Sequence, residues 1–219
     1  MKYSVRKADL PTKLDGCWDK SFWEGADTLI LENYMGEKPA HFPGTQARLL
    51  YDENYLYIIF RVEDRYIRAV SQKFGDAVYC DSCVEFFFTP GTDIGAGYFN
   101  IEMNCSGVML MCHQASRGQN CVVVKPEDLD KIEIFHSLPK IIEPEITEPT
   151  TWTLEYRLPI EILQRYTSVE RPDSGVVWRA NFYKCGDETS YPHWLMWAPI
   201  DLPQPDFHQP NFFGTLEFE

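Results

Sequence analysis

Two stretches, Cys83-Val84-Glu85-Phe86-Phe87-Phe88 and Tyr98-Phe99-Asn100-Ile101-Glu102-Met103-Asn104, decide the fold of this chain. Both stretches alternate, which predicts β-strands whose successive side chains point to opposite faces of a sheet. One face of the second strand is apolar, whereas Asn100, Glu102 and Asn104 occupy the other. In the first strand, Glu85 lies on the face opposite the core-filling Val84, Phe86 and Phe88.

A third stretch repeats this pattern, because Asn181, Tyr183 and Cys185 alternate with Phe182 and Lys184. A sheet face that carries carboxylates, amides and a tyrosine can hydrogen-bond a ligand rich in hydroxyl groups. The same pattern is also typical of the solvent-exposed side of a half-buried sheet. Both interpretations are compatible with the residues alone.

Strand signals dominate the rest of the chain, and helical signals are brief. Turn residues such as Asp52-Glu53-Asn54 separate the strands, which predicts one domain over residues 1–219 built as a sandwich or barrel. Prolines at the start of Pro126–Asp130 and Pro159–Leu163 predict two short helical segments. The expected strands are Gln46–Tyr51, Tyr55–Val62, Cys83–Thr89, Tyr98–Asn104, Val108–His113, Thr151–Leu158, Val177–Lys184, Leu195–Ala198 and Thr215–Phe218.

Composition limits the classes of partner. The 219 residues are 44% hydrophobic and 15% aromatic, enough for a sizeable core, and carry a formal net charge of −13. This charge argues against nucleic acid and against an anionic membrane surface as partners. Charged residues within Met1–Asp9 stand where a secretory signal needs an apolar segment. We therefore expect the chain as given to be cytoplasmic, or secreted or periplasmic if a leader was removed.

The cysteines favour reduced thiols over a disulfide framework. Seven cysteines cannot all pair within one chain, and they are scattered over a long sequence. Cys80-Asp81-Ser82-Cys83 has the CxxC spacing, but a zinc site of the usual pattern needs a second pair or suitably spaced histidines. We expect these cysteines to pack, and the metal ligands remain unknown.

The candidate chemistry centres on acidic and aromatic residues. Glu85 and Glu102 form a candidate carboxylate pair for glycoside hydrolysis, although carboxylates on a sheet also accept hydrogen bonds from sugars. Flat aromatic rings bind the apolar face of a sugar, so Tyr79, Tyr183, Tyr191, Trp194 and Phe207 are candidate walls. His208 follows Phe207 in a proline-rich loop, a setting that often holds function.

Two motifs in the first half of the chain are Leu14-Asp15-Gly16-Cys17-Trp18-Asp19 with Phe22-Trp23, and Asp81–Phe87. The first resembles the opening of family 9 carbohydrate-binding modules, and the second resembles the family's "D-S-V-E-I-F" with Cys83 as an additional or substituted position. The resemblance covers nearly the whole chain. It continues through Leu50–Tyr57, Tyr98–Asn104, Trp152–Glu155, Trp178–Tyr183 and Phe213–Leu216.

The resemblance implies an all-β, two-sheet antiparallel β-sandwich of the DOMON type with short helical insertions. It implies non-catalytic binding of oligo- or polysaccharide, at glucan or xylan chain ends in the best-known members, in connection with polysaccharide breakdown. It requires no cofactor, and many members hold structural calcium. Two tryptophans sandwich the sugar in the family, and Phe207 and Tyr79 stand at or near their positions. The expected carbohydrate-binding residues are Tyr79, Glu85, Asn100, Glu102, Asn181, Tyr183, Phe207 and His208.

Two alternatives remain beside sugar binding. Some DOMON-type relatives bind haem through methionine with histidine or lysine, and Met103 and Lys184 are the residues that could do so here. A glycoside-active enzyme would instead use Glu85 and Glu102, with no separate catalytic motif in the chain.

Overall fold

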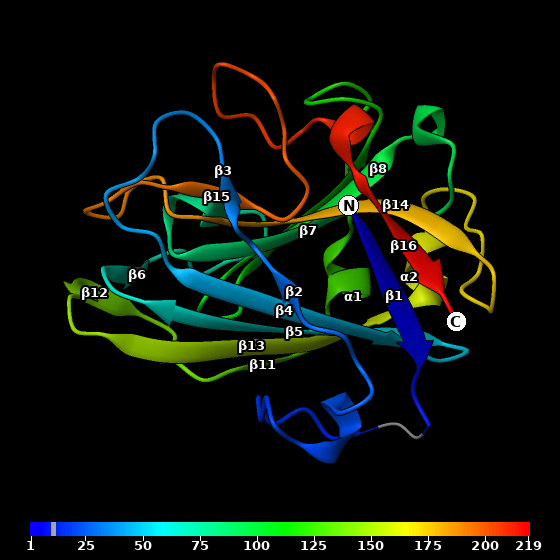
Figure 1. The fold of residues 1–219 in the computed structure, drawn as a ribbon, viewed down its shortest axis with the longest axis horizontal. Helices are drawn as coiled ribbons and strands as arrows, with labels where there is room; N and C mark the ends of the chain where they lie inside the picture. The colour runs from blue at the N-terminus through cyan, green and yellow to red at the C-terminus, as the bar shows by residue number, and fades with distance from the viewer. Residues whose placement is uncertain (10–11) are drawn as a thin grey trace.

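The computed structural model describes residues 1–9 and 12–219, and it is built almost entirely from β-strands in two facing layers (Figure 1). The first layer follows the hydrogen-bonded order β10 (Val122–Val123), β9 (Met109–Gln114), β8 (Tyr98–Asn104), β7 (Cys83–Thr89), β14 (Val177–Cys185) and β16 (Gly214–Phe218), with β15 (Trp194–Met196) and β3 (Asn33–Tyr34) attached. The second follows β4 (Gly44–Tyr51), β5 (Tyr55–Asp64), β13 (Thr150–Pro159) and β11 (Glu133–His136), with β2 (Leu29–Ile30) attached.

Strand β1 (Lys2–Lys7) joins the two layers into one curled sheet. Its first four residues, Lys2 to Val5, run parallel to β16, and its last two, Arg6 and Lys7, run parallel to β4. The other pairings within and between these strands are antiparallel, so the predicted β-sandwich is confirmed and β1 adds the parallel contacts.

Helices are short in the described ranges, as the sequence predicts. The α-helices are α1 (Pro126–Leu129) and α2 (Ile160–Leu163), and single 3-10 turns cover Ser21–Trp23, Val78–Cys80, Ile94–Ala96 and Pro210–Phe212. None of the helices in the described parts of the chain has the length and apolar character needed to cross a bilayer.

The apolar faces of the alternating strands fill the space between the layers. Phe86, Phe88 and Phe182 are buried and stack with ring centroids 4.5–4.6 Å apart. Phe60 of β5 reaches this stack from the other layer, 6.1 Å from Phe182. Removing such large apolar surfaces from water is the main stabilising contribution to the fold. The period-2 pattern therefore identifies the core correctly.

The opposite face of β7, β8 and β14 is buried as well. Glu85, Asn100 and Glu102 are only 2–4% exposed, because residues 205–213 fold over this part of the sheet and pack Phe207 and Phe213 against it. The interpretation of this face as the solvent-exposed side of a half-buried sheet is wrong. The pattern shows which side chains share a face, but it does not show what covers that face.

The sequence pattern does not predict the short strands β6 (Ile67–Ala69) and β12 (Ile142–Ile146). The proline- and acid-rich composition of Glu143–Thr150 predicts a loop, yet its first residues belong to β12, which pairs with β6 in a separate two-stranded sheet. Proline is tolerated in such an edge strand because its missing N–H can face away from the partner strand.

The N-terminal motif Asp15-Gly16 is held by the second layer. The backbone N–H groups of Asp15 and Gly16 donate to the buried Glu155 carboxylate, which also pairs with Lys20 at 2.6 Å. Gly16 has a φ of +68° and lies against the Phe135 ring, where a Cβ atom would come within 2.3 Å. Glycine is therefore required here by both backbone conformation and space.

Candidate functional site

A pocket of about 340 Å³ opens over the polar face of β7, β8 and β14. The sheet supplies its floor, and the segments around Tyr79, Asp187 and Asp206 supply its walls. Polar and aromatic groups thus converge in a concavity at one point of the sandwich, as expected of a small-molecule site. The lining residues are Tyr79, Glu85, Asn100, Glu102, Leu110, Cys112, Gln114, Arg117, Gly118, Cys121, Cys185, Asp187, Trp194, Pro205, Asp206, Phe207 and His208.

Two carboxylates lie side by side on the floor. Glu85 of β7 is directly opposite Glu102 of β8, and both are almost fully buried. Burial raises the pKa of Glu102 to about 7, and burial together with the nearby Cys185 and Glu102 raises the pKa of Glu85 well above its usual range. Arg117 on the pocket wall pairs with Asp206 at 3.3 Å. The floor therefore favours protonated carboxyl groups, which can both donate and accept hydrogen bonds.

A chain of side-chain hydrogen bonds orients the amides beside these carboxyls. Asn100 donates from Nδ2 to Glu102 Oε1 at 3.0 Å, and Gln114 donates from Nε2 to Asn100 Oδ1 at 2.8 Å. The backbone N–H of Gly118 donates to Gln114 Oε1 at 2.8 Å. Such a connected network fixes the direction of each polar group before a ligand arrives.

His208 lies at one end of this network. Its Nδ1 atom is 2.8 Å from the Tyr98 hydroxyl and 3.3 Å from Gln114 Nε2. Burial and the positive charge of Arg117 lower the pKa of His208 to about 4, so the ring is neutral at pH 7. His208 therefore adds a neutral, hydrogen-bonding ring to the pocket.

Aromatic side chains from separate elements stand around the floor. Tyr79 is 41% exposed, and Trp194 is partly buried with its indole N–H donating to Asp187 Oδ1 at 2.9 Å. Phe207 is 8% exposed and stacks on Tyr183, with ring centroids 4.1 Å apart and planes 10° from parallel. Tyr79 and Trp194 thus offer more accessible ring surface than Phe207.

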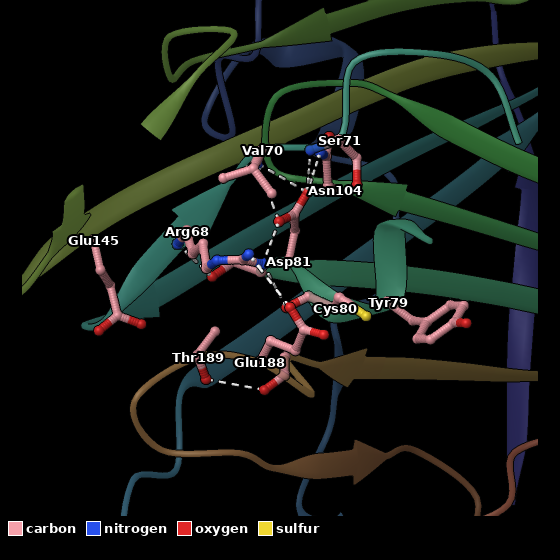
Figure 2. A network of polar contacts seen from close by, with 12 residues as sticks. Arg68, Val70, Ser71, Tyr79, Cys80, Asp81, Asn104, Glu145, Glu188 and Thr189 are labelled. Carbon is pink, nitrogen blue, oxygen red and sulfur yellow. Dashed lines mark hydrogen bonds and ion pairs between the residues drawn. The ribbon is translucent and has the colours of Figure 1, made fainter. Parts of the chain in front are cut away.

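A buried carboxylate fixes the segment that presents Tyr79 (Figure 2). Asp81 accepts hydrogen bonds from the Ser71 backbone at 2.9 Å, from Asn104 Nδ2 at 2.9 Å and from Arg68 Nη1 at 3.0 Å. Figure 2 shows the Tyr79 ring pointing away from this network. Asp81 therefore holds the 3-10 turn of Val78–Cys80 in place and leaves the Tyr79 ring free of it.

Six of the eight residues predicted to bind carbohydrate line the pocket, and two lie outside its lining. Asn181 is fully buried, and its side chain bonds the backbone N–H and C=O of Ala198, each at 2.8 Å. Tyr183 is also fully buried, lies beneath Phe207 and donates its hydroxyl to the Phe207 carbonyl at 3.0 Å. These two residues support the pocket from below. The six that line it are Tyr79, Glu85, Asn100, Glu102, Phe207 and His208.

Several lining residues were missed because their neighbours come from distant segments. Gln114 continues the alternation of β9, but the expected strand ended at His113. Asp187 and Arg117 lie in turns that no strand pattern orients toward the floor. Cys185 was identified as part of the alternating face without a role, and its thiol donates to Glu85 Oε1 at 3.1 Å.

The residues considered for haem lie on the core side of the sheet. Met103 is 1% exposed between the layers. Lys184 donates to His193 Nε2 at 2.8 Å and to the Cys185 carbonyl at 3.0 Å, and its ammonium lies 3.4 Å from Asp64. These contacts would have to break before Lys184 could ligate haem iron.

Asp52 and Asp64, whose carboxylates could offer oxygen ligands to calcium, are engaged with hydrogen-bond donors of the chain. Asp52 accepts from the backbone N–H groups of Asn54 and Tyr55 and from the Tyr57 hydroxyl. Asp64 accepts from Arg65 and interacts with His41. Calcium prefers a shell of free oxygen ligands. A structural calcium ion stays a prediction.

The fold and pocket together define a ligand-binding β-sandwich, and the comparisons identify its family. The model of "Carbohydrate-binding family 9" matches residues 22–218, so the chain belongs to that family and is a carbohydrate-binding module of its type. The comparison with curated proteins finds no match. The family resemblance drawn from the sequence motifs is therefore confirmed.

Solved structures agree with this assignment. A protein from Bacteroides uniformis, described as a candidate carbohydrate-binding protein, shares 30% identity over 100% of this chain and 99% of its own, with a TM-score of 0.89. Two structures of a family 9 module from Caldicellulosiruptor kristjanssonii have the same fold. The cellotriose complex has a TM-score of 0.67 and 13% identity, over 100% of this chain and 94% of its own. The glucose complex has a TM-score of 0.64 and 12% identity, over 99% of this chain and 95% of its own.

Proposed function

We propose that the pocket over β7, β8 and β14 binds the end of a neutral oligo- or polysaccharide chain of the glucan or xylan type. The observation that carries this proposal is the connected floor of Glu85, Glu102, Asn100 and Gln114 beside the accessible rings of Tyr79 and Trp194. Sugars present hydroxyl groups at their edges and apolar C–H groups on their faces, which match this combination of groups.

The charge distribution supports a neutral sugar over an acidic one. Glu85, Glu102, Asp187 and Asp206 all line the pocket, and the whole chain carries a net charge of −13. A uronic acid would bring another carboxylate into this buried environment, where burial disfavours its charged form and Arg117 of the lining already pairs with Asp206. Related family 9 structures hold cellotriose and glucose, which are neutral.

Binding is favoured over hydrolysis by where the two carboxyl groups lie. Glycoside hydrolases place their carboxyl groups on two sides of the scissile bond. Glu85 and Glu102 are instead register partners on one face of one sheet, so both approach a ligand from the floor. We expect no release of reducing sugar from cello- or xylo-oligosaccharides, and release that disappears in Glu85→Gln would support hydrolysis instead.

Isothermal titration calorimetry with cellotriose, xylotriose and a trigalacturonate tests the proposal. We expect binding of at least one neutral trisaccharide, no binding of the uronate, and at least tenfold weaker binding by Glu85→Gln and Glu102→Gln. Glu127→Gln is the matched control, because the Glu127 side chain is 74% exposed and lies outside the pocket lining. Equal affinities in all three variants would place the sugar elsewhere.

A further inference from the structure

Two thiols and one carboxyl group gather at the pocket floor. Cys83 of β7 is the direct register partner of Cys185 of β14, and Glu85 lies two residues further along β7 on the same face. One donor atom from each of the three residues lies within 4.8 Å of the other two. All three side chains are buried, at 0%, 1% and 3% exposure for Cys83, Cys185 and Glu85.

The spacing of these donors suits a small tetrahedral metal ion. Zinc lies about 2.3 Å from thiolate sulfur and about 2.0–2.2 Å from carboxylate oxygen, so ligand atoms around it are about 3.5–3.8 Å apart. Cys185 Sγ and Glu85 Oε1 are 3.1 Å apart, and the longest separation in the cluster is below 4.8 Å. Small rotations of the side chains would therefore bring the three donors to one ion, while the paired strands hold their backbones in place.

The surroundings favour a cation at this position. Glu102 is the register partner of Glu85, and the carboxyl groups of Glu102 and Asp187 line the same pocket. Lys184, the cation of the adjacent β14 position, points to the other face and bonds His193. A buried carboxyl group and two buried thiols are costly to ionise alone, and a bound metal ion would compensate their charges.

We propose that Cys83, Glu85 and Cys185 form a site for a thiophilic divalent metal ion such as Zn²⁺. Two sulfur donors select zinc over magnesium or calcium, which prefer oxygen. Binding releases the protons of both thiols and of any protonated Glu85 to the solvent. Cys185 and Glu85 line the pocket, so the fourth coordination position faces the pocket and is accessible to water or to a ligand hydroxyl group.

Metal binding at this cluster does not depend on carbohydrate, so it is tested in the absence of sugar. The reduced protein is titrated with Co²⁺, whose thiolate complexes have a charge-transfer band in the near ultraviolet. We expect one equivalent of Co²⁺ to saturate this band and Zn²⁺ to abolish it. Cys83→Ser and Cys185→Ser should each weaken Co²⁺ binding at least a hundredfold. Cys112→Ser and Cys121→Ser are the matched controls and should keep the band, because both residues line the pocket outside the cluster.

Glu85→Gln keeps both thiols and provides a second variant if the serine variants fail to fold. We expect it to bind Co²⁺ at least tenfold more weakly while its circular dichroism spectrum stays unchanged. Absence of the band in the reduced wild-type protein overturns the proposal. Loss of the band in the Cys112 or Cys121 variants alone overturns it as well, as does a mass spectrum that shows a Cys83–Cys185 disulfide under reducing conditions.

Discussion

Two groups of buried ionisable side chains lie on opposite faces of the sheet formed by β7, β8 and β14, and they are partnered in different ways. On the core face, Lys184 contacts Asp64 at 3.4 Å and His193 at 2.8 Å, and Asp64 also contacts His41 at 2.8 Å. On the pocket face, Glu85 and Glu102 receive hydrogen bonds from a thiol and an amide. The charges on the core face are compensated by other side chains of the protein, whereas the carboxyl groups on the pocket face can still form hydrogen bonds with a ligand.

The pKa shifts follow this difference. Burial opposes ionisation of Asp64, but the Lys184 ammonium and the His41 contact hold its pKa below the usual range. Burial and Lys184 lower the pKa of His193 to about 3, so this ring stays neutral and accepts from Lys184. Burial instead raises the pKa of both pocket carboxyls. A buried charge partnered by the chain serves stability, whereas a buried ionisable group without a charged partner is a candidate for ligand binding.

The largest expected effect comes from breaking the core network. Lys184→Met leaves the buried Asp64 carboxylate without its ammonium partner and should lower the free energy of unfolding by about 3–5 kcal/mol. Urea unfolding measures this change. Lys125→Met is the control, since its pair with Glu127 is exposed and should change stability by less than about 1 kcal/mol. Equal effects of the two variants would contradict the distinction.

The next effect is on the pH dependence of stability. The pKa of Glu102 is about 7 in the folded protein and 4.5 in the unfolded reference, so the folded state holds an extra proton between these values. The contribution of Glu102 therefore makes stability fall as pH rises through this window. Glu102→Gln should remove this pH dependence. The difference in free energy of unfolding between the variant and the wild type should rise by at least about 1 kcal/mol from pH 4.5 to pH 8, in favour of the variant.

Unfolding curves at several pH values between 4.5 and 8 check this prediction. Asp64 has the opposite effect on stability. Because its pKa is lowered in the folded protein, the stability that its carboxylate contributes is lost only as the pH falls below about 3.8. Parallel profiles for wild type and Glu102→Gln from pH 4.5 to 8 would show that the Glu102 carboxyl is not protonated preferentially in the fold.

The smallest effect separates the two aromatic walls. Tyr79→Ala removes an exposed ring and should change stability by no more than about 0.5 kcal/mol. It should weaken binding of a neutral trisaccharide by about 0.5–1.5 kcal/mol, the range of aromatic contacts. Phe207→Ala should weaken binding and also destabilise the fold, since Phe207 stacks on Tyr183. Calorimetry and thermal unfolding measure both quantities; unchanged affinity in Tyr79→Ala would exclude its ring from the site.

The sequence predicts which side chains share a face of the sheet, but it does not predict which segments bury that face. Alternation correctly assigns Phe86 and Ile101 to the core and Glu85 and Glu102 to the opposite face, because side-chain direction in a strand depends on local backbone geometry alone. The burial of that second face depends on residues 205–213, which are more than 100 residues away in the chain. No local pattern reports such a long-range contact.

The same limit explains why the pocket lining differs from the set of residues expected from the sequence. Asn181 shares the face of Tyr183, but its amide turns to the Ala198 backbone, and only the path of the segment after β15 makes that pairing available. Gln114 and Asp187 enter the pocket through the ends of strands and turns, where element boundaries are least certain from sequence. Family motifs identified Tyr79 and Phe207, whereas Trp194 was recognised only as one aromatic candidate among several.

The most direct test of the central claim is a crystal structure of the protein grown with cellotriose. We expect a terminal sugar ring over the β7–β8–β14 floor, with hydroxyl groups within hydrogen-bond distance of Glu85 and Glu102 and its apolar face against Tyr79 or Trp194. A cellotriose molecule bound to the ordered protein away from this floor, with Glu85 and Glu102 free of contact, would contradict it.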